Sequence, residues 1–310
     1  MLYFIVNPNS RSGSGKKIWN LLHKELVQRK IAFQYKMTEY IGHATEHAAY
    51  FSSLGTPQDP VVIVVVGGDG TISEVLTGIV NLDNVIFGVI PTGSGNDFCR
   101  GMKLPTDPIE ALDVILSCKR IMKLDIPRLE AQNHNGRFGI SAGIGFDAAC
   151  CHEIAVAPSK TFFNKIKLGK LVYVYTAIKQ ILFIKPSEMK ITLDGDRRFR
   201  FSRVYFAAVM NQKYEGGGFQ FCPKAKPNDQ ILDLIVVEGL SKLAILLCLP
   251  TAFWGKHTHF RGIHIMRCRS VQIQSAVKAP VHKDGEICGM QEKISVILEK
   301  SSLKIIVPVL

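Results

Sequence analysis

The residues with the clearest chemical potential are Gly67-Gly68-Asp69-Gly70-Thr71, which directly follow the apolar run Val61–Val66. This run of valines and one isoleucine is typical of a strand buried on both faces. Glycines after such a strand let backbone N–H groups approach phosphate oxygens, and Thr71 can donate a further hydrogen bond. A predicted helix over 73–80 would direct its positive end at the same anion. The motif indicates a phosphate-binding loop, in which Asp69 calls for a cation or a proton-transfer role.

Polar loops also follow two other predicted strands in the first half of the chain. Asn7–Gly15 follows the predicted strand Leu2–Val6, and Pro91–Phe98 follows Val85–Ile90. The first loop is not a P-loop, because it does not match G-x-x-x-x-G-K-[ST]. Each loop alone is also compatible with an ordinary β–α connection. Three such loops at neighbouring strand ends indicate nucleotide binding.

Four motifs in the second half carry glycines or acids in patterns that suit a binding site. They are Gly143-Ile144-Gly145-Phe146-Asp147, Gly216-Gly217-Gly218, Pro223–Asp233 and Lys283-Asp284-Gly285-Glu286. Asp229 with nearby carbonyl groups suits a hard cation such as Mg²⁺, and the Asp-Gly-Glu turn can present a general base. Each motif is also compatible with a surface loop or a hairpin turn.

The composition is that of a globular protein. With 47% hydrophobic and 21% charged residues, 310 residues are enough for two domains with cores of their own. The first residues, Met1–Val6, lack a basic leader and predict a strand rather than a signal peptide. The eight cysteines show no C-x-x-C pair and no metal-ligand spacing, which favours buried, reduced thiols in a cytoplasmic protein.

The net charge of +12 is concentrated between Lys160 and Lys213. This window holds twelve Lys or Arg residues and three acids, hence a net +9. Such a segment attracts nucleic acid or an anionic membrane surface. No nucleic-acid-binding motif accompanies the charge, and no apolar stretch is long enough to span a bilayer. We therefore expect peripheral contact with an anionic membrane and no nucleic acid.

Alternating strand and helix signals up to residue 124 predict a doubly wound parallel sheet. The expected strands are 2–6, 33–37, 61–66 and 85–90, and the expected helices are 16–29, 44–51, 73–80 and 108–116. Ligands bind such sheets at the carboxyl ends of the strands, where the three polar loops fall. From residue 125, short strand-like runs separated by turns predict an antiparallel β-sandwich with a few inserted helices. We thus expect domains at 1–124 and 125–298, and a last strand within 299–310 that returns to either domain.

In chain order the motifs are an Asn-Pro loop, Gly-Gly-Asp-Gly-Thr, Pro-x-Gly-x-x-Asn-Asp, Gly-Gly-Gly, Pro-x-Ala-x-x-x-Asp-x-x-Leu-Asp and Asp-Gly-Glu. This ordered set resembles the diacylglycerol kinase catalytic-domain family, most closely its soluble bacterial lipid kinases, over essentially the whole chain. The resemblance implies an N-terminal α/β domain that binds ATP and a C-terminal β-sandwich that binds the lipid. It places the active site in the cleft between the two domains.

The resemblance also implies roles for individual residues. Glu286 would accept the proton of the attacking hydroxyl, with Asp284 fixing geometry or metal. Asp69 and Asp97 would help to organise the catalytic Mg²⁺ and the phosphates. A structural Mg²⁺ would be held by Asp229 and the main-chain oxygens of Lys226 and Ile231. The expected ATP contacts are Asn7, Pro8, Asn9, Ser10, Arg11, Thr38, Gly67, Gly68, Asp69, Gly70, Thr71, Ile72, Ser73, Glu74, Gly93, Ser94, Asn96 and Asp97.

Two positions depart from the family pattern. Gln230 stands where the family usually has a glycine, which puts the geometry of the structural metal loop in question. Ser94 stands where threonine is common, and its hydroxyl keeps the expected contact.

The implied reaction is transfer of the ATP γ-phosphoryl group to a lipid hydroxyl, most simply from diacylglycerol to phosphatidic acid. The basic segment would dock at the inner face of the membrane. Its apolar members would enter the interface or pack in the β domain; they are Phe162, Phe163, Leu171, Tyr173 and Tyr175. Two alternatives are a soluble-metabolite kinase of the NAD kinase type and a non-catalytic nucleotide- or lipid-binding module. The lipid stays open among alcohols such as diacylglycerol, sphingosine-like bases and undecaprenol, as does a homodimer through an edge strand.

Overall fold

The computed structural model describes residues 1–150 and 183–309. The chain divides into two compact units. Unit 1 comprises Met1–Ile126 and Glu299–Leu310, and unit 2 comprises Pro127–Leu298. The sequence placed the boundary after residue 124, and the structure assigns the final segment to unit 1.

Unit 1 is built on a mostly parallel sheet with the spatial order β2-β1-β3-β4-β17-β5. The strands are β1 (Leu2–Val6), β2 (Phe33–Met37), β3 (Val61–Gly67), β4 (Val85–Pro91), β5 (Ile121–Leu124) and β17 (Leu303–Ile306). β3 lies between β1 and β4, which explains why its side chains are apolar on both faces. β17 pairs in parallel with β4 and antiparallel with β5.

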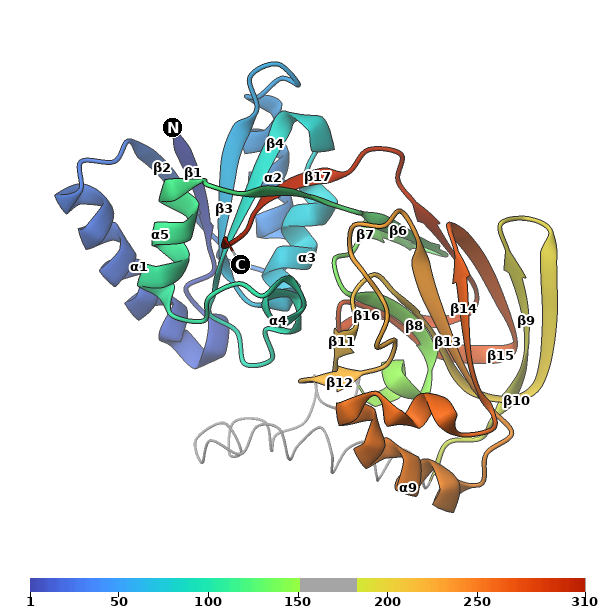
Figure 1. Ribbon diagram of the computed structural model, residues 1–310. Coiled ribbons are helices and arrows are strands. Elements are labelled where there is room, and N and C mark those ends of the chain that lie inside the picture. Colours follow the sequence, from blue (N-terminus) through green and yellow to red (C-terminus); the bar gives the residue numbers. More distant parts are fainter. Residues whose placement is uncertain (151–182, 310) are drawn as a thin grey trace. The chain divides into compact units, whose positions relative to one another are not determined.

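Helices cover both faces of this sheet (Figure 1). α1 (Ser10–Gln28) and α5 (Pro108–Ser117) lie on one face, and α2 (His43–Ser53) and α3 (Asp69–Gly78) lie on the other. Trp19, Leu22 and Leu26 of α1 join the core cluster that also includes side chains of α5 and the sheet. The predicted doubly wound parallel sheet is confirmed.

Two helices begin earlier than the sequence predicted, and one was missed. α1 starts at Ser10 rather than residue 16, and α3 starts at Asp69 rather than residue 73. The short α4 (Asp97–Met102) lies in a stretch predicted to be a loop. α1 and α3 begin with small or polar residues that lack apolar periodicity, and α4 is only six residues long, so the pattern alone did not reveal them. The phosphate-loop residues Gly70 and Thr71 are therefore part of a helix.

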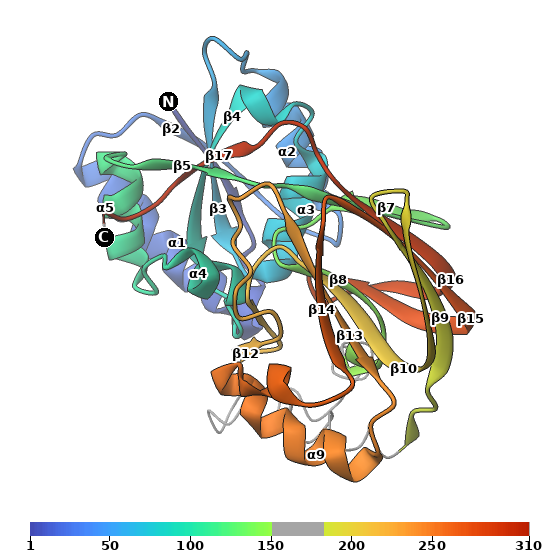
Figure 2. The same cartoon turned by 45° about the vertical axis from the view of Figure 1, so that its right-hand side comes forward.

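Unit 2 consists mainly of antiparallel strands. The larger sheet has the order β14-β13-β10-β8-β15-β16-β6-β7, and β9 pairs with both β10 and β15. The strands are β6 (Pro127–Ala131), β7 (His134–Arg137), β8 (Ser141–Gly145), β9 (Ser187–Leu193), β10 (Arg197–Met210), β13 (Leu232–Glu238), β14 (Ile263–Cys268), β15 (Ser270–Lys283) and β16 (Glu286–Leu298). The long strands β10, β15 and β16 are curved, as Figure 2 shows, and side chains of these strands contribute to an apolar core cluster. The predicted antiparallel second domain is confirmed.

The sequence predicted a few inserted helices in this domain without their positions, and one helical stretch lies between β13 and β14. It comprises α9 (Lys242–Thr251), η2 (Ala252–Trp254) and η3 (Lys256–His259). α9 is apolar on all sides, so its sequence carries no helical alternation of apolar and polar residues. Within the described ranges, none of the helices combines the length and the apolar character needed to cross a bilayer.

Candidate active-site residues

The three polar loops of unit 1 meet at the carboxyl ends of β1, β3 and β4. The Asn7 side chain donates from Nδ2 to Thr71 Oγ1 at 2.9 Å, which links the first loop to the start of α3. The hydroxyls of Ser10 and Thr92 lie 2.6 Å apart and link the first loop to the third. The loops predicted to lie together are therefore in direct contact, and their binding of phosphate stays a prediction.

Glycines allow the second and third loops to touch. A Cβ on Gly68 would lie 3.0 Å from Cα of Gly93, and a Cβ on Gly67 would lie 2.5 Å from Cβ of Thr71. Neither Cα of Gly93 nor Cβ of Thr71 can shift without moving the backbone, which is energetically costly. The glycine pattern is thus required by the close approach of the loops as well as by any ligand.

Asp69 has a structural partner that the sequence did not suggest. Its carboxylate accepts hydrogen bonds from the backbone N–H groups of Asp97, at 3.3 Å, and Phe98, at 3.2 Å. These are orphan donors in the first turn of α4, so Asp69 caps that helix from the neighbouring loop. Asp97 in turn pairs with the Arg100 guanidinium. Both acids are held rigidly at the strand ends, and their roles toward Mg²⁺ stay predictions.

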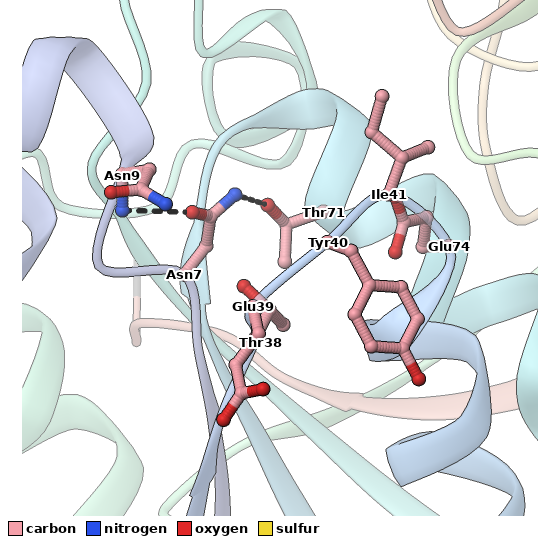
Figure 3. A pocket seen from close by; sticks show the side chains of 8 residues that line it. All are labelled: Asn7, Asn9, Thr38, Glu39, Tyr40, Ile41, Thr71 and Glu74. Carbon is pink, nitrogen blue, oxygen red and sulfur yellow. Dashed lines mark hydrogen bonds between the residues drawn. The ribbon is translucent and has the colours of Figure 1, made fainter.

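A hollow of about 200 Å³ lies beside these loops. Figure 3 shows Asn7 hydrogen-bonded to the neighbouring Asn9 on one side and Thr71 on the other. Five predicted ATP contacts line the hollow; these are Asn7, Asn9, Thr38, Thr71 and Glu74. Glu74 Oε2 also accepts the Ala44 N–H at 3.1 Å, so this carboxylate caps α2.

Sequence reasoning missed the other lining residues, Glu39, Tyr40 and Ile41. They follow Thr38 directly, at the carboxyl end of β2, and that position in a parallel sheet was the available signal. The Tyr40 ring stacks on His43 at 4.3 Å between centroids, and its hydroxyl donates to Glu46. Ile41 is 95% exposed beside the hollow.

Not every predicted contact can reach a ligand with its side chain. Ile72 is 1% exposed and Ser73 is fully buried, so only their backbone groups face the loop side of α3. Asn96 adopts a left-handed backbone with φ of 52°, and its buried Oδ1 has no hydrogen-bond partner in the described part of the chain. That oxygen lies next to Gly93, whose added Cβ would be 2.7 Å away.

In unit 2, the Asp-Gly-Glu turn joins β15 to β16. The Asp284 carboxylate accepts three backbone N–H groups, from Gly139 and Ile140 at 2.8 Å and from Ser141 at 3.0 Å. Burial raises the pKa of Asp284, although these hydrogen bonds act to lower it. The geometry gives Asp284 the role of an anchor that fixes the turn.

Glu286 is the acid of this turn that faces outward. Its side chain is one-third exposed, and its Oε2 lies 3.7 Å from the Lys283 ammonium. Glu286 thus stands on a turn that Asp284 anchors, and part of its side chain is accessible from solvent. This is the geometry that a general base needs, and its role stays a prediction.

A buried polar cluster beneath the turn was not predicted as a unit. His282 is fully buried, with Nε2 at 3.0 Å from Asp147 Oδ2 and 3.2 Å from Glu215 Oε1. Burial alone would lower the pKa of His282, but the charges of Glu215 and Asp147 raise it to about 9. The Gly285 N–H lies 3.3 Å from Nδ1, so the cluster also contacts the turn.

The triple glycine explains how Glu215 reaches this cluster. β11 (Tyr214–Glu215) and β12 (Phe219–Gln220) form a small hairpin, and its connection consists of Gly216, Gly217 and Gly218. All three have positive φ, at 63°, 83° and 117°. Only glycine adopts three such conformations in a row without strain, so this turn requires the motif.

The residues of the predicted structural metal site are Asp229, Lys226 and Ile231, and their surroundings can be compared with what a bound cation requires. Asp229 Oδ1 is buried without a hydrogen-bond partner among the described residues, as suits an oxygen reserved for a cation. Its Oδ2 pairs with Arg267, which also lies 3.8 Å from Asp233. Gln230 has φ of 60°, so this side chain tolerates the left-handed backbone for which the family uses glycine. The unpartnered Asp229 oxygen fits a hard cation, and the structural metal site with Lys226 and Ile231 stays a prediction.

The basic window predicted to dock on membranes falls partly outside the described residues. Five of its cations lie in 151–182, together with the aromatic residues Phe162, Phe163, Tyr173 and Tyr175. Of the described cations, Arg197 pairs with Asp194 and Arg200 with Glu188. These surface pairs reduce the free positive charge of that strand.

Comparison with known proteins agrees with this geometry. Residues 1–128 match the diacylglycerol kinase catalytic domain, and residues 144–307 match the YegS C-terminal NAD kinase beta sandwich-like domain. A Bacillus subtilis (strain 168) protein named "Putative lipid kinase YtlR" is 31% identical, over 93% of each chain. The chain belongs to the diacylglycerol kinase catalytic-domain family.

Other relatives show comparable or lower sequence identity to this chain. The diacylglycerol kinase of Staphylococcus saprophyticus is 30% identical, over 81% of this chain and 77% of its own. A crystal structure of a "putative diacylglycerol kinase" from Bacillus anthracis str. Sterne covers 99% of this chain and 97% of its own with a TM-score of 0.76 at 23% identity. An NAD kinase from Archaeoglobus fulgidus reaches a TM-score of only 0.52 at 13% identity, so it shares the fold alone.

Proposed function

We propose that the protein is an ATP- and Mg²⁺-dependent lipid kinase that phosphorylates a primary hydroxyl, with diacylglycerol as the acceptor. The observation that carries this proposal is the joining of three glycine-bearing loops at the ends of β1, β3 and β4. Family membership adds the expectation of a lipid acceptor. Phosphoryl transfer needs positioning and charge neutralisation more than covalent chemistry, and rigid loops of backbone donors supply the positioning.

In this proposal, unit 1 binds the phosphates and unit 2 supplies the general base. In unit 1, the phosphates are held by Asn7, by Thr71 and by backbone N–H groups in the first turn of α3. The carboxylates of Asp69 and Asp97 lie at the same strand ends. ATP supplies the transferred group, and Mg²⁺ neutralises the charge that develops on it. In unit 2, Glu286 accepts the proton of the acceptor hydroxyl while Asp284 fixes its turn. Asp229, with the main-chain oxygens of Lys226 and Ile231, would hold the structural cation.

Replacing Glu286 by Gln tests the proposed base. Removal of a general base lowers turnover by about 10²–10⁴. Assayed with ATP, Mg²⁺ and diacylglycerol in mixed micelles, Glu286→Gln should lose activity on this scale while its KM for ATP stays within about twofold. Glu292→Gln, an exposed acid on the same strand β16, is the matched control and should keep normal turnover.

The outcome separates the candidate functions. Near-normal turnover of Glu286→Gln would remove the proposed mechanism. Absence of turnover in the wild-type protein across a panel of lipid alcohols, with ATP still bound in calorimetry, would favour a non-catalytic module. Phosphorylation of NAD in place of lipid would favour the NAD kinase alternative.

A further inference from the structure

The surface of the α9–η3 stretch exposes large apolar side chains in a regular pattern. Leu243 is 66% exposed, Leu247 is 65% exposed and Trp254 is 70% exposed. The two leucines stand four residues apart on α9, so they share one helix face. We call the surface formed by Leu243, Leu247 and Trp254 the α9 face.

The opposite side of the same helix is already used for packing. Ile245 and Cys248 are buried, and Leu246 and Leu249 pack against a second core cluster of unit 2, to which Ile245 belongs. A helix that is apolar all round is ordinarily buried on all sides. α9 therefore presents a second apolar face that its own core does not use.

Neighbouring contacts hold this face rigidly. Phe253 stacks on Phe219 at 4.1 Å between ring centroids, and its carbonyl accepts the Gln220 side-chain amide at 2.8 Å. Gly255 turns the chain with φ of 69°, directly after Trp254. Because Phe253 is anchored inward, the adjacent Trp254 is held outward at the end of α9.

All charged residues in the sequence that surrounds the α9 face are basic. From Gly239 to Lys283 the chain contains no Asp or Glu. Lys242 precedes the first leucine, and Lys256 and Arg261 follow Trp254; all three are exposed. η3 contacts both α9 and η2, so Lys256, its first residue, lies near the apolar surface in space as well as in sequence. Figure 1 shows α9 on unit 2.

We propose that the α9 face docks on an anionic lipid bilayer, with Leu243, Leu247 and Trp254 entering the interface and the neighbouring cations contacting phosphate headgroups. Leu and Trp side chains on one helix face, with Lys and Arg beside them, are what an interfacial helix requires. Large exposed apolar patches with a polar rim mark interaction sites. A free protein partner would be expected to balance the cations with acids, whereas a membrane supplies negative charge across the whole surface.

This inference deepens the proposed function, because a lipid kinase needs access to an acceptor that stays in the bilayer. It assigns docking to described residues that the basic window between Lys160 and Lys213 does not include. Vesicle binding is measured without ATP or turnover. Failure of docking and failure of the kinase proposal are therefore separate results.

Vesicle sedimentation tests the face directly. The wild-type protein is mixed with vesicles of phosphatidylcholine alone, or of phosphatidylcholine and phosphatidylglycerol in equal parts. Leu243→Ser/Leu247→Ser should weaken binding to the mixed vesicles by about tenfold or more, because two interfacial side chains are lost. Lys256→Glu/Arg261→Glu should weaken it by about fivefold per removed cation, and more for the reversed sign. Val80→Ser, an equally exposed apolar residue of unit 1, should bind normally.

Trp254 supplies a second readout within the intact chain. Trp19 is 2% exposed in the core of unit 1, so brominated lipids should quench only Trp254. Quenching that is lost in the double serine variant supports the proposal. Sedimentation without quenching, or unchanged binding of both double variants, would overturn it in favour of another docking segment. A wild-type dimer that the serine variant converts to a monomer in light scattering would also overturn it, because the face would then bind a second copy.

Discussion

Replacement of Asp284 by Asn separates an anchoring role from a catalytic one. The carboxylate accepts three backbone N–H groups in a buried setting, two of them at Oδ1 and one at Oδ2. Asn keeps an oxygen for Ile140 and Ser141 but turns an amide N–H₂ toward the Gly139 N–H. One buried donor then lacks an acceptor, and the remaining bonds lose their charge assistance. The expected loss of local stability is about 3 kcal/mol.

Asp194 offers a matched control in a second Asp-Gly turn. Its Oδ1 accepts the backbone N–H groups of Arg269 and Ser270, at 2.8 and 3.0 Å. The Asp194 side chain is 35% exposed, so water can replace what Asn fails to accept. Asp194→Asn should therefore lose about 1 kcal/mol or less.

Amide hydrogen exchange measures the two changes where they act. In Asp284→Asn, a loss of about 3 kcal/mol should speed exchange of the amides of residues 139–141 by about two orders of magnitude. The amides of residues 269 and 270 should change less than tenfold in Asp194→Asn. Unchanged protection at 139–141 would refute the anchoring argument, and loss of turnover with full protection would return Asp284 to the reacting groups.

Three further outcomes follow from the described geometry. The raised pKa of His282 contributes stability that is complete below the ordinary histidine pKa of 6.5 and is lost as the pH rises through about 9. In urea unfolding, the wild type should therefore lose about 3 kcal/mol of unfolding free energy over this pH interval, and His282→Gln should lose little. Gly143→Ala should lower the melting temperature, because the new Cβ would lie 1.9 Å from Asp147 Oδ2. A melting temperature equal to that of the wild type would contradict the described cluster. Gln230→Gly should raise stability by roughly 0.5–1 kcal/mol in urea titrations by relieving a left-handed side chain, and a decrease would mean that the Gln230 side chain is needed.

The parts of the site that could be predicted are those encoded in contiguous residues. A β-branched run followed by Gly67-Gly68 specifies both a buried strand and a loop at its carboxyl end, and strand neighbours in a parallel sheet bring such loops together. The family motifs then supplied the remaining expected contacts. Tyr40 and Ile41 have no motif of their own and follow only from where β2 ends.

Other features could not be predicted because they depend on residues distant in sequence. Asp147, Glu215 and His282 come from three separate elements, and each looks like part of an ordinary turn or strand. The capping of α4 by Asp69 joins two loops that are adjacent only in the folded sheet. The position of α9 was not predicted for a different reason, since a helix that is apolar on both faces has no period to detect.

The position of β17 has a consequence for how the protein is made. The sheet of unit 1 receives this strand, Leu303–Ile306, between β4 and β5, although all of unit 2 is synthesised before it. During synthesis, the sheet of unit 1 therefore cannot be completed before Leu303–Ile306 are available, while unit 2 can already fold. A nascent chain stalled before residue 303 should expose the edge of β4 to protease or chaperones, and a chain extended until residues 303–306 can pair should protect it.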